Sequence, residues 1–374
     1  MPRLPELPSL HAPPGAHPWR PSGKSKSPTA CRAFESPGRL TAMTTTPRHP
    51  RDYGGKFSLH DTDDGTPIRE LFELGPRLLL ITNKCIYAVQ MADQIDPDRT
   101  NPSLPHNLQQ KLFDHGVQSD LLCRSLLHAR VMFRKEFQKI DVVQAMQLSM
   151  DAFTELASMQ SAALTFRADE AAAIEKAERP QSKDGSFALP ALGDVRGRCK
   201  SFAQHADHAA GALLSIVRLF YPEMKGKNWD DFHALIEGRH GKDDNYSKVL
   251  ECTVPFLKIV RNLRDCLGHQ NVAGAVTRDF SLEPDGQVWL PSVELDFRGS
   301  IVQRCSISDF MAESTKTLLD SFEMITLHMC AKHVEPFAGM PMTIAPLDDN
   351  YRQAWHVRFA YGSYYADGRF VPCG

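Results

Sequence analysis

The 374-residue sequence lacks several features that would assign it to a class of protein directly. Its nine cysteines form no Cys-x-x-Cys pair, which argues against a zinc ribbon, a dithiol redox motif or a disulfide framework and fits a reducing compartment. No apolar run reaches the ~20 residues that a membrane-spanning helix needs. No repeat of fixed period is present either. We therefore expect a cytoplasmic protein that is not embedded in a membrane.

The chain also lacks the positive charge of a protein that coats nucleic acid. Its 43 Lys and Arg against 45 Asp and Glu give a formal net charge of −2. From residue 51 onward, 36 basic residues oppose 43 acidic ones, which leaves about −7. Extensive binding to nucleic acid depends on neutralising many phosphates. Any contact with RNA is therefore expected to be local, in a cleft.

The first 50 residues differ in composition from the rest. They hold 11 of the 26 prolines and few aliphatic residues, and Glu6 and Glu35 are their only acids. Such a segment buries too little apolar surface to offset the entropy lost on ordering it. We predict a disordered, Pro-rich leader over residues 1–55. Three interpretations of it stay open: a basic tail, a targeting peptide, and a leader that is not translated because synthesis starts at Met43.

From Thr66 onward, apolar residues recur with the period of an α-helix. Thr66-Pro67 is typical of a helix start. The apolar stripe that follows comprises Leu78, Ile81, Cys85 and Val89. Later stretches predict helices over about 112–137, 141–178, 192–220, 228–238, 246–268 and 308–333. Pro255 either kinks the 246–268 helix or marks its true start. The expected fold is mainly α, with one helical domain over residues 66–335.

The apolar period changes from 3.6 to 2 after His269. Alternation over 276–282, 288–290 and 293–297 predicts strands, and Pro284-Asp285-Gly286 is typical of a hairpin turn. We therefore predict a small β insertion over residues 275–304. The tail, residues 336–374, is irregular or β-rich, with a hairpin around Asp367-Gly368.

One helix end concentrates side chains that can do chemistry. Its apolar stripe consists of Phe256, Val260, Leu263 and Leu267, at i, i+4, i+7 and i+11. The other faces carry Arg261, Asn262, Arg264 and Asp265, with His269 following. Gly268 tends to stop a helix, so His269 lies at or just past its end. A cation, a carboxylate and an imidazole are thus expected at one terminus.

This arrangement resembles the signature of the HEPN superfamily. In that signature an Arg is followed directly by a polar residue, and four to six residues separate the Arg from a His. Four residues lie between Arg264 and His269, and Asp265 is the polar residue. Arg261-Asn262 has the more familiar Arg-Asn opening, but seven residues separate Arg261 from the His. We therefore assign the motif to Arg264. The helical layout, with one long helix after the motif, is similar to that of HEPN proteins.

The resemblance implies a metal-independent endoribonuclease whose active site forms where two motif helices meet in a homodimer, with RNA as substrate and no cofactor. Histidine is the side chain best suited to transfer a proton near neutral pH, so His269 is the expected proton-transfer group. Cleavage of RNA through its own 2′-hydroxyl passes through a charged phosphorane. Arg264 offers a permanently charged fork of donors that could stabilise it. Asp265 is expected to orient the His or position the Arg. The expected substrate contacts are Arg261, Asn262 and Asn271.

Proteins of this kind occur in toxin–antitoxin and phage-defence systems, where an antitoxin or a nucleotidyltransferase is the partner. Because some HEPN proteins are inactive, the alternative is a catalytically silent helical module that binds a nucleotide or another protein. A purely structural explanation also exists, since the helix dipole favours a His at its C-terminus and Asp265 could hydrogen-bond to it. His205 and His208 have metal-ligand spacing, but no third ligand is evident, so helix packing is favoured.

Overall fold

The computed structural model describes residues 67–177, 188–269 and 272–373. These residues divide into two compact units. The larger unit contains residues 115–363 and 372–373, and the smaller contains 67–114 and 364–371. The predicted leader, residues 1–55, lies outside the described residues, as does Asn271.

Residues 70–113 of the smaller unit form a four-stranded antiparallel sheet. Its strands, in the order β1-β2-β3-β4, are β1 (Glu70–Leu74), β2 (Arg77–Ile81), β3 (Ile86–Met91) and β4 (Asn107–Phe113). A single helical turn, α1 (Ala92–Ile95), follows β3. The expected helix from Thr66 is therefore wrong. The helix expected over about 112–137 is also shorter than predicted: the chain is helical only over 120–132, and residues 112 and 113 belong to β4.

The apolar residues of this region serve a sheet rather than one helical stripe. In β2, Leu79, Leu80 and Ile81 are all buried. A strand covered on both faces can bury three consecutive apolar residues, whereas a helix with one apolar face cannot. Leu80 packs in a core cluster with Tyr87 and Val89 of β3. A two-residue turn at Gly75-Pro76 joins β1 to β2, and Gly75 has a φ of 59°. A short apolar run fits either a strand or a helix, and the turn at Gly75-Pro76 is what makes this run a strand.

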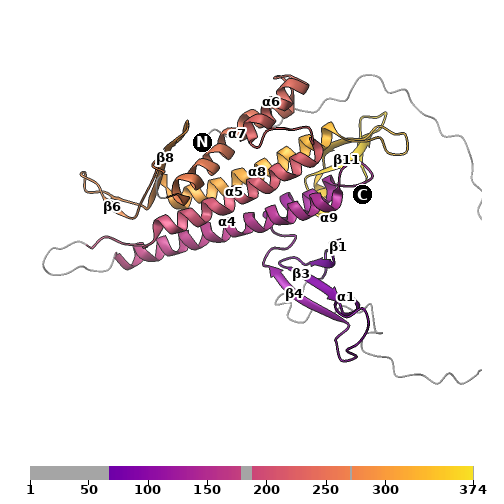
Figure 1. The fold of residues 1–374 in the computed structure, drawn as a ribbon, viewed down its shortest axis with the longest axis horizontal. Helices are drawn as coiled ribbons and strands as arrows, with labels where there is room; N and C mark the ends of the chain where they lie inside the picture. The colour runs from indigo at the N-terminus through magenta and orange to yellow at the C-terminus, as the bar shows by residue number, and fades with distance from the viewer. Residues whose placement is uncertain (1–66, 178–187, 270–271, 374) are drawn as a thin grey trace, which may run out of the picture. The chain divides into compact units, whose positions relative to one another are not determined.

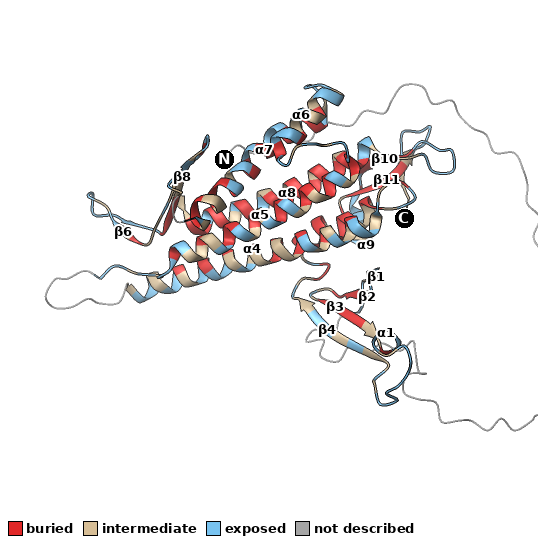
Figure 2. Cartoon of the chain, in the orientation of Figure 1, coloured by how far each residue is buried: buried red, intermediate tan, exposed pale blue. Residues whose placement is uncertain are grey.

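Four long helices form the core of the larger unit (Figure 1). They are α4 (Val142–Ala177), α5 (Val195–Phe220), α7 (Asn245–Gly268) and α8 (Ile307–Lys332). α5 packs against α4 and α7, and α8 contacts all three. Figure 2 shows buried residues along the helix sides that face one another. The helices predicted from periodicity are confirmed here to within a few residues at each end.

Side-chain caps set several of the helix starts. Asp194 caps α5 by accepting from Gly197 N–H, and Asn228 caps α6 (Trp229–His240) by accepting from Asp231 N–H. Asp244 caps α7 in the same way through Tyr246 N–H. Such caps contribute about 1 kcal/mol each to helix stability. Because α7 begins at Asn245 and continues through Pro255, that proline does not mark its start.

Ahead of α4, the chain forms one irregular helical segment. Its parts are α2 (Asp120–Leu122), the π-helical η2 (Cys123–Leu127) and α3 (His128–Met132). π-Helical turns are rare and occur often at functional sites. This segment packs on α4 and α8.

Strands follow α7, as the change of period predicts. A three-stranded sheet has the order β5-β8-β9, with β5 (Ala275–Arg278), β8 (Ser292–Phe297) and β9 (Ser300–Ser306). In the sequence between β5 and β8, β6 (Ser281–Leu282) pairs with β7 (Val288–Trp289) across a turn in which Gly286 has a φ of 81°. The C-terminal elements are β10 (Thr343–Pro346), α9 (Asp349–Trp355), β11 (Phe359–Tyr364) and β12 (Phe370–Pro372). The fold is therefore mixed, with small sheets beside a helical bundle.

None of the helices in the described ranges combines the length and the apolar character needed to cross a membrane.

Two histidines of the larger unit, the buried His128 and the partly buried His328, should make its stability sensitive to acid. Burial lowers the pKa of His128 to about 4 and the pKa of His328 to about 4. In an unfolded chain the histidine pKa is about 6.5, so the unfolded state binds more protons between these values. Stability is therefore complete above about pH 6.5 and is lost as the pH falls toward 4. At about pH 5 each histidine should cost about 2 kcal/mol of unfolding free energy.

Urea denaturation at about pH 7.5 and about pH 5 measures this effect, since carboxylates stay largely ionised over that range. A His328→Phe variant should show a weaker pH dependence than the natural chain. An unfolding free energy that does not change between the two pH values would contradict the burial of neutral histidines.

Candidate functional site

The predicted motif lies in the last two turns of α7. The apolar stripe of Phe256, Val260, Leu263 and Leu267 is buried, as predicted, and it fixes the rotation of the helix. His269 is the C-cap, with φ −110° and ψ 124°, and its N–H donates to Asp265 O at 3.1 Å. The chain leaves the helix in extended conformation at His269, whose side chain is exposed.

Arg264 is held between two carboxylates. Its Nε and Nη2 lie 2.9 and 2.8 Å from Asp207 Oδ2 on α5, and its Nη1 lies 2.8 Å from Asp265 Oδ1. The side chain remains 35% exposed. A guanidinium has five N–H donors, so these three contacts leave N–H groups on Nη1 and Nη2 for a ligand. The arginine is thus fixed in place and still able to bind an anion.

Asp265 contacts arginines rather than the histidine. One carboxylate oxygen accepts from Arg264, and the other lies 3.5 Å from Nη1 of Arg298. Within the described residues, no group forms a hydrogen bond with the His269 ring. Of the two roles expected for Asp265, the geometry therefore favours positioning of Arg264 over orientation of His269.

The three expected substrate contacts lie in different surroundings. Asn262 is 7% exposed, and its Nδ2 donates to Ser300 Oγ at 2.8 Å and to Phe297 O at 3.3 Å. Arg261 is exposed and forms no ion pair with any residue that the structure describes. Asn271 lies outside the described residues. Asn262 thus anchors the β insertion to α7, whereas Arg261 faces solvent.

Three residues at this helix end carry no sequence signal. Asp207 reaches Arg264 from α5, Arg298 reaches Asp265 from the β8–β9 turn, and Arg196 donates from Nη2 to Cys266 O at 3.2 Å. They lie between about 30 and 70 positions away from the motif, so only the tertiary fold brings them there. Helix-spacing rules reach four positions at most.

His205 and His208 turn toward α4 rather than toward a shared ligand. Their Nδ1 atoms lie 2.6 and 3.5 Å from the two carboxylate oxygens of Glu155. Asp207, between them in sequence, points to Arg264 instead. No group of three or more potential metal ligands occurs among the described residues.

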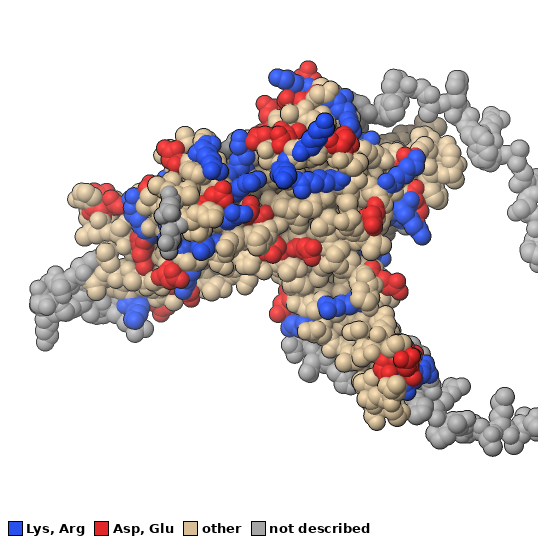
Figure 3. Space-filling model, in the orientation of Figure 1, with Lys and Arg blue, Asp and Glu red and all other residues tan. Residues whose placement is uncertain are grey.

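Positive charge exceeds negative charge at the end of α7. Arg196, Arg261, Arg264 and Arg298 lie on or against its last two turns, together with Asp207 and Asp265. With Asp296, whose N–H donates to Gly274 O beside the same helix end, the formal surplus is one positive charge, which still outweighs the roughly −0.5 charge of a helix C-terminus. Elsewhere on the face shown in Figure 3, acidic and basic side chains are interspersed. An anion would therefore meet a local, not a continuous, basic surface.

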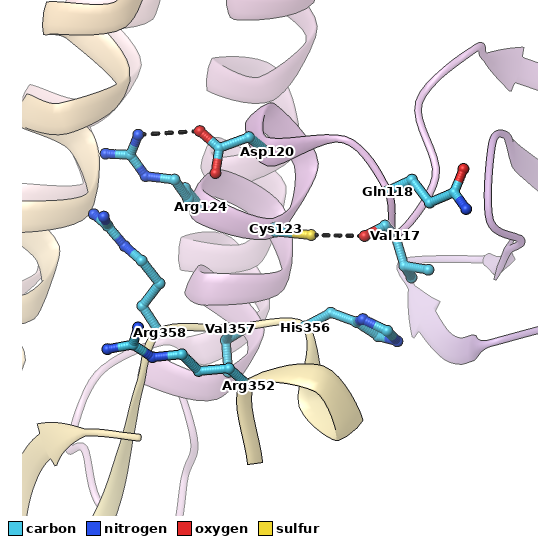
Figure 4. A pocket seen from close by; sticks show the side chains of 9 residues that line it. All are labelled: Val117, Gln118, Asp120, Cys123, Arg124, Arg352, His356, Val357 and Arg358. Carbon is cyan, nitrogen blue, oxygen red and sulfur yellow. Dashed lines mark hydrogen bonds and ion pairs between the residues drawn. The ribbon is translucent and has the colours of Figure 1, made fainter. Parts of the chain in front are cut away.

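A second group of arginines lines a pocket in the same unit (Figure 4). This pocket, about 280 Å³ in volume, is lined by Val117, Gln118, Asp120, Cys123, Arg124, Arg352, His356, Val357 and Arg358. Figure 4 shows the guanidinium groups of the three arginines on one side of it and the His356 ring on the other. Arg124 belongs to η2, and its side chain is 8% exposed.

The buried charges beside this pocket neutralise one another. Glu323 of α8 is fully buried and accepts from Arg124 Nε at 2.7 Å and from Arg358 Nε at 2.8 Å. Arg124 also donates to Asp320 and, at 3.2 Å, to Asp120. Burial alone would raise the pKa of Glu323, but its cationic neighbours hold that pKa below its usual range. The network ties η2 and the segment after α9 to α8, so we interpret it as structural.

Replacing Glu323 should therefore destabilise the fold strongly. Glu323→Gln removes the charge that compensates two guanidinium groups and turns an amide N–H₂ toward one of them. Breaking a buried ion pair on one side costs about 3–5 kcal/mol of unfolding free energy. Asp120→Asn is the matched control, because it contacts the same Arg124 but its side chain is 75% exposed. That change should cost less than about 1 kcal/mol.

Urea denaturation of both variants measures the difference. Equal, small losses would show that the Glu323 network does not hold the C-terminal segment in place.

Comparison of the chain with models of known protein families, with curated proteins and with solved structures finds no significant match.

Proposed function

We propose that this chain is a HEPN-like, metal-independent endoribonuclease whose active site lies at the C-terminal end of α7. The observation that carries the proposal is the pairing of an anchored, half-exposed Arg264 with an exposed His269 at the same helix end. The motif spacing and the four-helix bundle around it support the same assignment. The local surplus of positive charge suits a phosphate in a chain that is acidic overall.

The chemistry requires both proton transfer and charge stabilisation. The 2′-hydroxyl of RNA loses its proton and attacks the adjacent phosphorus, and the 5′-oxygen leaves with a proton. His269 would serve as the base or the acid. The free N–H groups of Arg264 would stabilise the charge that builds on the phosphoryl oxygens. Asp207 and Asp265 hold the guanidinium so that little reorganisation accompanies reaction.

One histidine supplies only one of the two proton-transfer groups. In a homodimer that brings two α7 ends together, the partner subunit's His269 would supply the other. We therefore include a homodimer in the proposal, with a light-scattering mass near twice the 41.9 kDa chain mass as its expected signature. A monomer with full ribonuclease activity would remove this part of it. An antitoxin or a nucleotidyltransferase is the partner proposed for regulation.

A second candidate function is a catalytically silent module that binds a nucleotide or another protein. The observation in its favour is that Arg264 already has two carboxylate partners, Asp207 and Asp265. In that case the arginine serves the packing of α5 on α7. The two functions differ in what the loss of Arg264 does to stability and to RNA cleavage.

Alanine substitutions at the site test the proposal. His269→Ala and Arg264→Ala should each reduce RNA cleavage by at least about 100-fold, because each removes a group acting in the transition state. The loss of unfolding free energy should stay below about 1 kcal/mol for the exposed His269. Asp265→Ala should be milder, since Asp207 still holds Arg264.

Cleavage of a labelled single-stranded RNA and urea denaturation are measured for each variant. His356→Asn and Arg218→Ala are matched controls that alter the same residue types away from the motif at the end of α7. Asparagine tolerates the left-handed backbone of His356, whose φ is 57°. Unchanged cleavage in His269→Ala would rule the site out, and unfolding of that variant would show that His269 is a structural cap.

A further inference from the structure

We propose that Arg298, on the turn between β8 and β9, is a further phosphate-binding side chain of this site and contacts the sugar-phosphate backbone of single-stranded RNA. The inference rests on the proposed function. It assigns to the β insertion a direct part in binding substrate beside α7.

The backbone at Arg298 is unfavourable for an arginine. Phe297 pairs with Ser300, so Arg298 and Gly299 form a two-residue hairpin turn. Their φ values are 49° and 78°, so both central residues are left-handed, as in a type I′ turn. Asn, Asp and Gly are strongly preferred at the first of these positions, because other side chains are strained there. An arginine at that position therefore indicates a role for its side chain that offsets the strain.

The turn is fixed against the end of α7 from two sides. The buried Asn262 amide donates to Phe297 O and Ser300 Oγ, the two residues that flank the turn. The chain leaving α7 passes close by at Gly274, whose O accepts from Asp296 N–H at 2.7 Å. A Cβ on Gly274 would lie 2.9 Å from both Asp296 O and Phe297 Cβ. Arg298 is therefore presented on a rigid support next to the motif.

The contacts of Arg298 hold its guanidinium near Arg264 but do not use all of its hydrogen-bond donors. Its guanidinium lies over the Phe297 ring, 4.7 Å from the centroid, and 3.5 Å from Asp265 Oδ2. The side chain is 67% exposed. An ion pair this exposed contributes little to stability, so it does not by itself account for the strained turn. Since Asp265 also contacts Arg264, the two arginines flank one carboxylate and could bind neighbouring phosphates of one strand.

RNA binding by Arg298→Asn tests the inference, because asparagine removes the charge and suits the turn. The assay uses fluorescence anisotropy of a labelled single-stranded oligoribonucleotide at several salt concentrations, with His269→Ala in every protein so that the RNA stays intact. Arg298→Asn should weaken binding by roughly 5–10-fold and lower the salt slope of log K by about 0.7, the value for one phosphate contact on a single strand. Arg298→Lys should retain most of the affinity.

Arg278→Asn is the matched control, because it removes the same charge from the same insertion. Arg278 lies on β5 and pairs with Glu294, and its side chain is 40% exposed. The Arg278→Asn variant should bind RNA with the affinity and salt slope of the parent, the protein that carries His269→Ala alone. The melting temperature of Arg298→Asn should be unchanged or higher, since the turn is relieved; a lower melting temperature would show that the arginine is structural and would overturn the inference.

The outcomes separate this inference from the proposed catalysis. If Arg298→Asn binds RNA with the parent's affinity and salt slope, the inference is overturned, whatever the cleavage activity. If RNA binding depends on Arg298 but the natural chain does not cleave RNA, the inference stands and the ribonuclease proposal fails. If no variant binds RNA, the inference is overturned, and RNA cleavage by the natural chain decides the ribonuclease proposal separately.

Discussion

Burial of one apolar stripe on α7 determines which side chains at its end face α5, the β insertion and solvent. With Leu263 and Leu267 in the core, Asn262 is directed to the β8–β9 turn and Arg264 to Asp207 on α5. A rotation of the helix would expose apolar side chains at a cost of about 25 cal/mol for each Å². The hydrophobic contact therefore sets the direction in which the polar side chains of α7 itself, Asn262 and Arg264, leave the helix.

The larger unit contains two arginine-rich places, which differ in how deeply their central charges are buried. Around Glu323, the carboxylate and Arg124 are both buried, so removing one of them costs the fold several kcal/mol, whereas Arg358 at the edge of this network is 42% exposed. At the end of α7, Arg264, Arg298 and Arg261 retain solvent-facing N–H groups, and the cations outnumber the anions. Matched buried charge restricts the relative positions of helices. Unmatched, partly exposed charge is available to bind an anion, which is why the proposed activity is placed at α7.

The sequence predicts the long helices well because apolar residues recur along each one with the 3.6-residue period. It fails between residues 66 and 113, where apolar runs as short as those around Leu78 fit either a strand or a helix. Periodicity also places Asn262 and Arg264 on α7 correctly but does not give their partners. Asp207 and Arg298 approach from α5 and from a hairpin turn, and no local spacing encodes such encounters. The strain at Arg298 likewise depends on a turn register that only the paired strands define.

The central claim is that the end of α7 cleaves RNA through the RNA's own 2′-hydroxyl and without a metal ion. Mass spectrometry of the product ends, after incubation of purified protein with single-stranded RNA in excess EDTA, tests it most directly. The account predicts 2′,3′-cyclic phosphate and 5′-hydroxyl ends, formed at the same rate with and without the chelator. Cleavage that EDTA abolishes, ends that carry a 5′-phosphate, or intact RNA would contradict it.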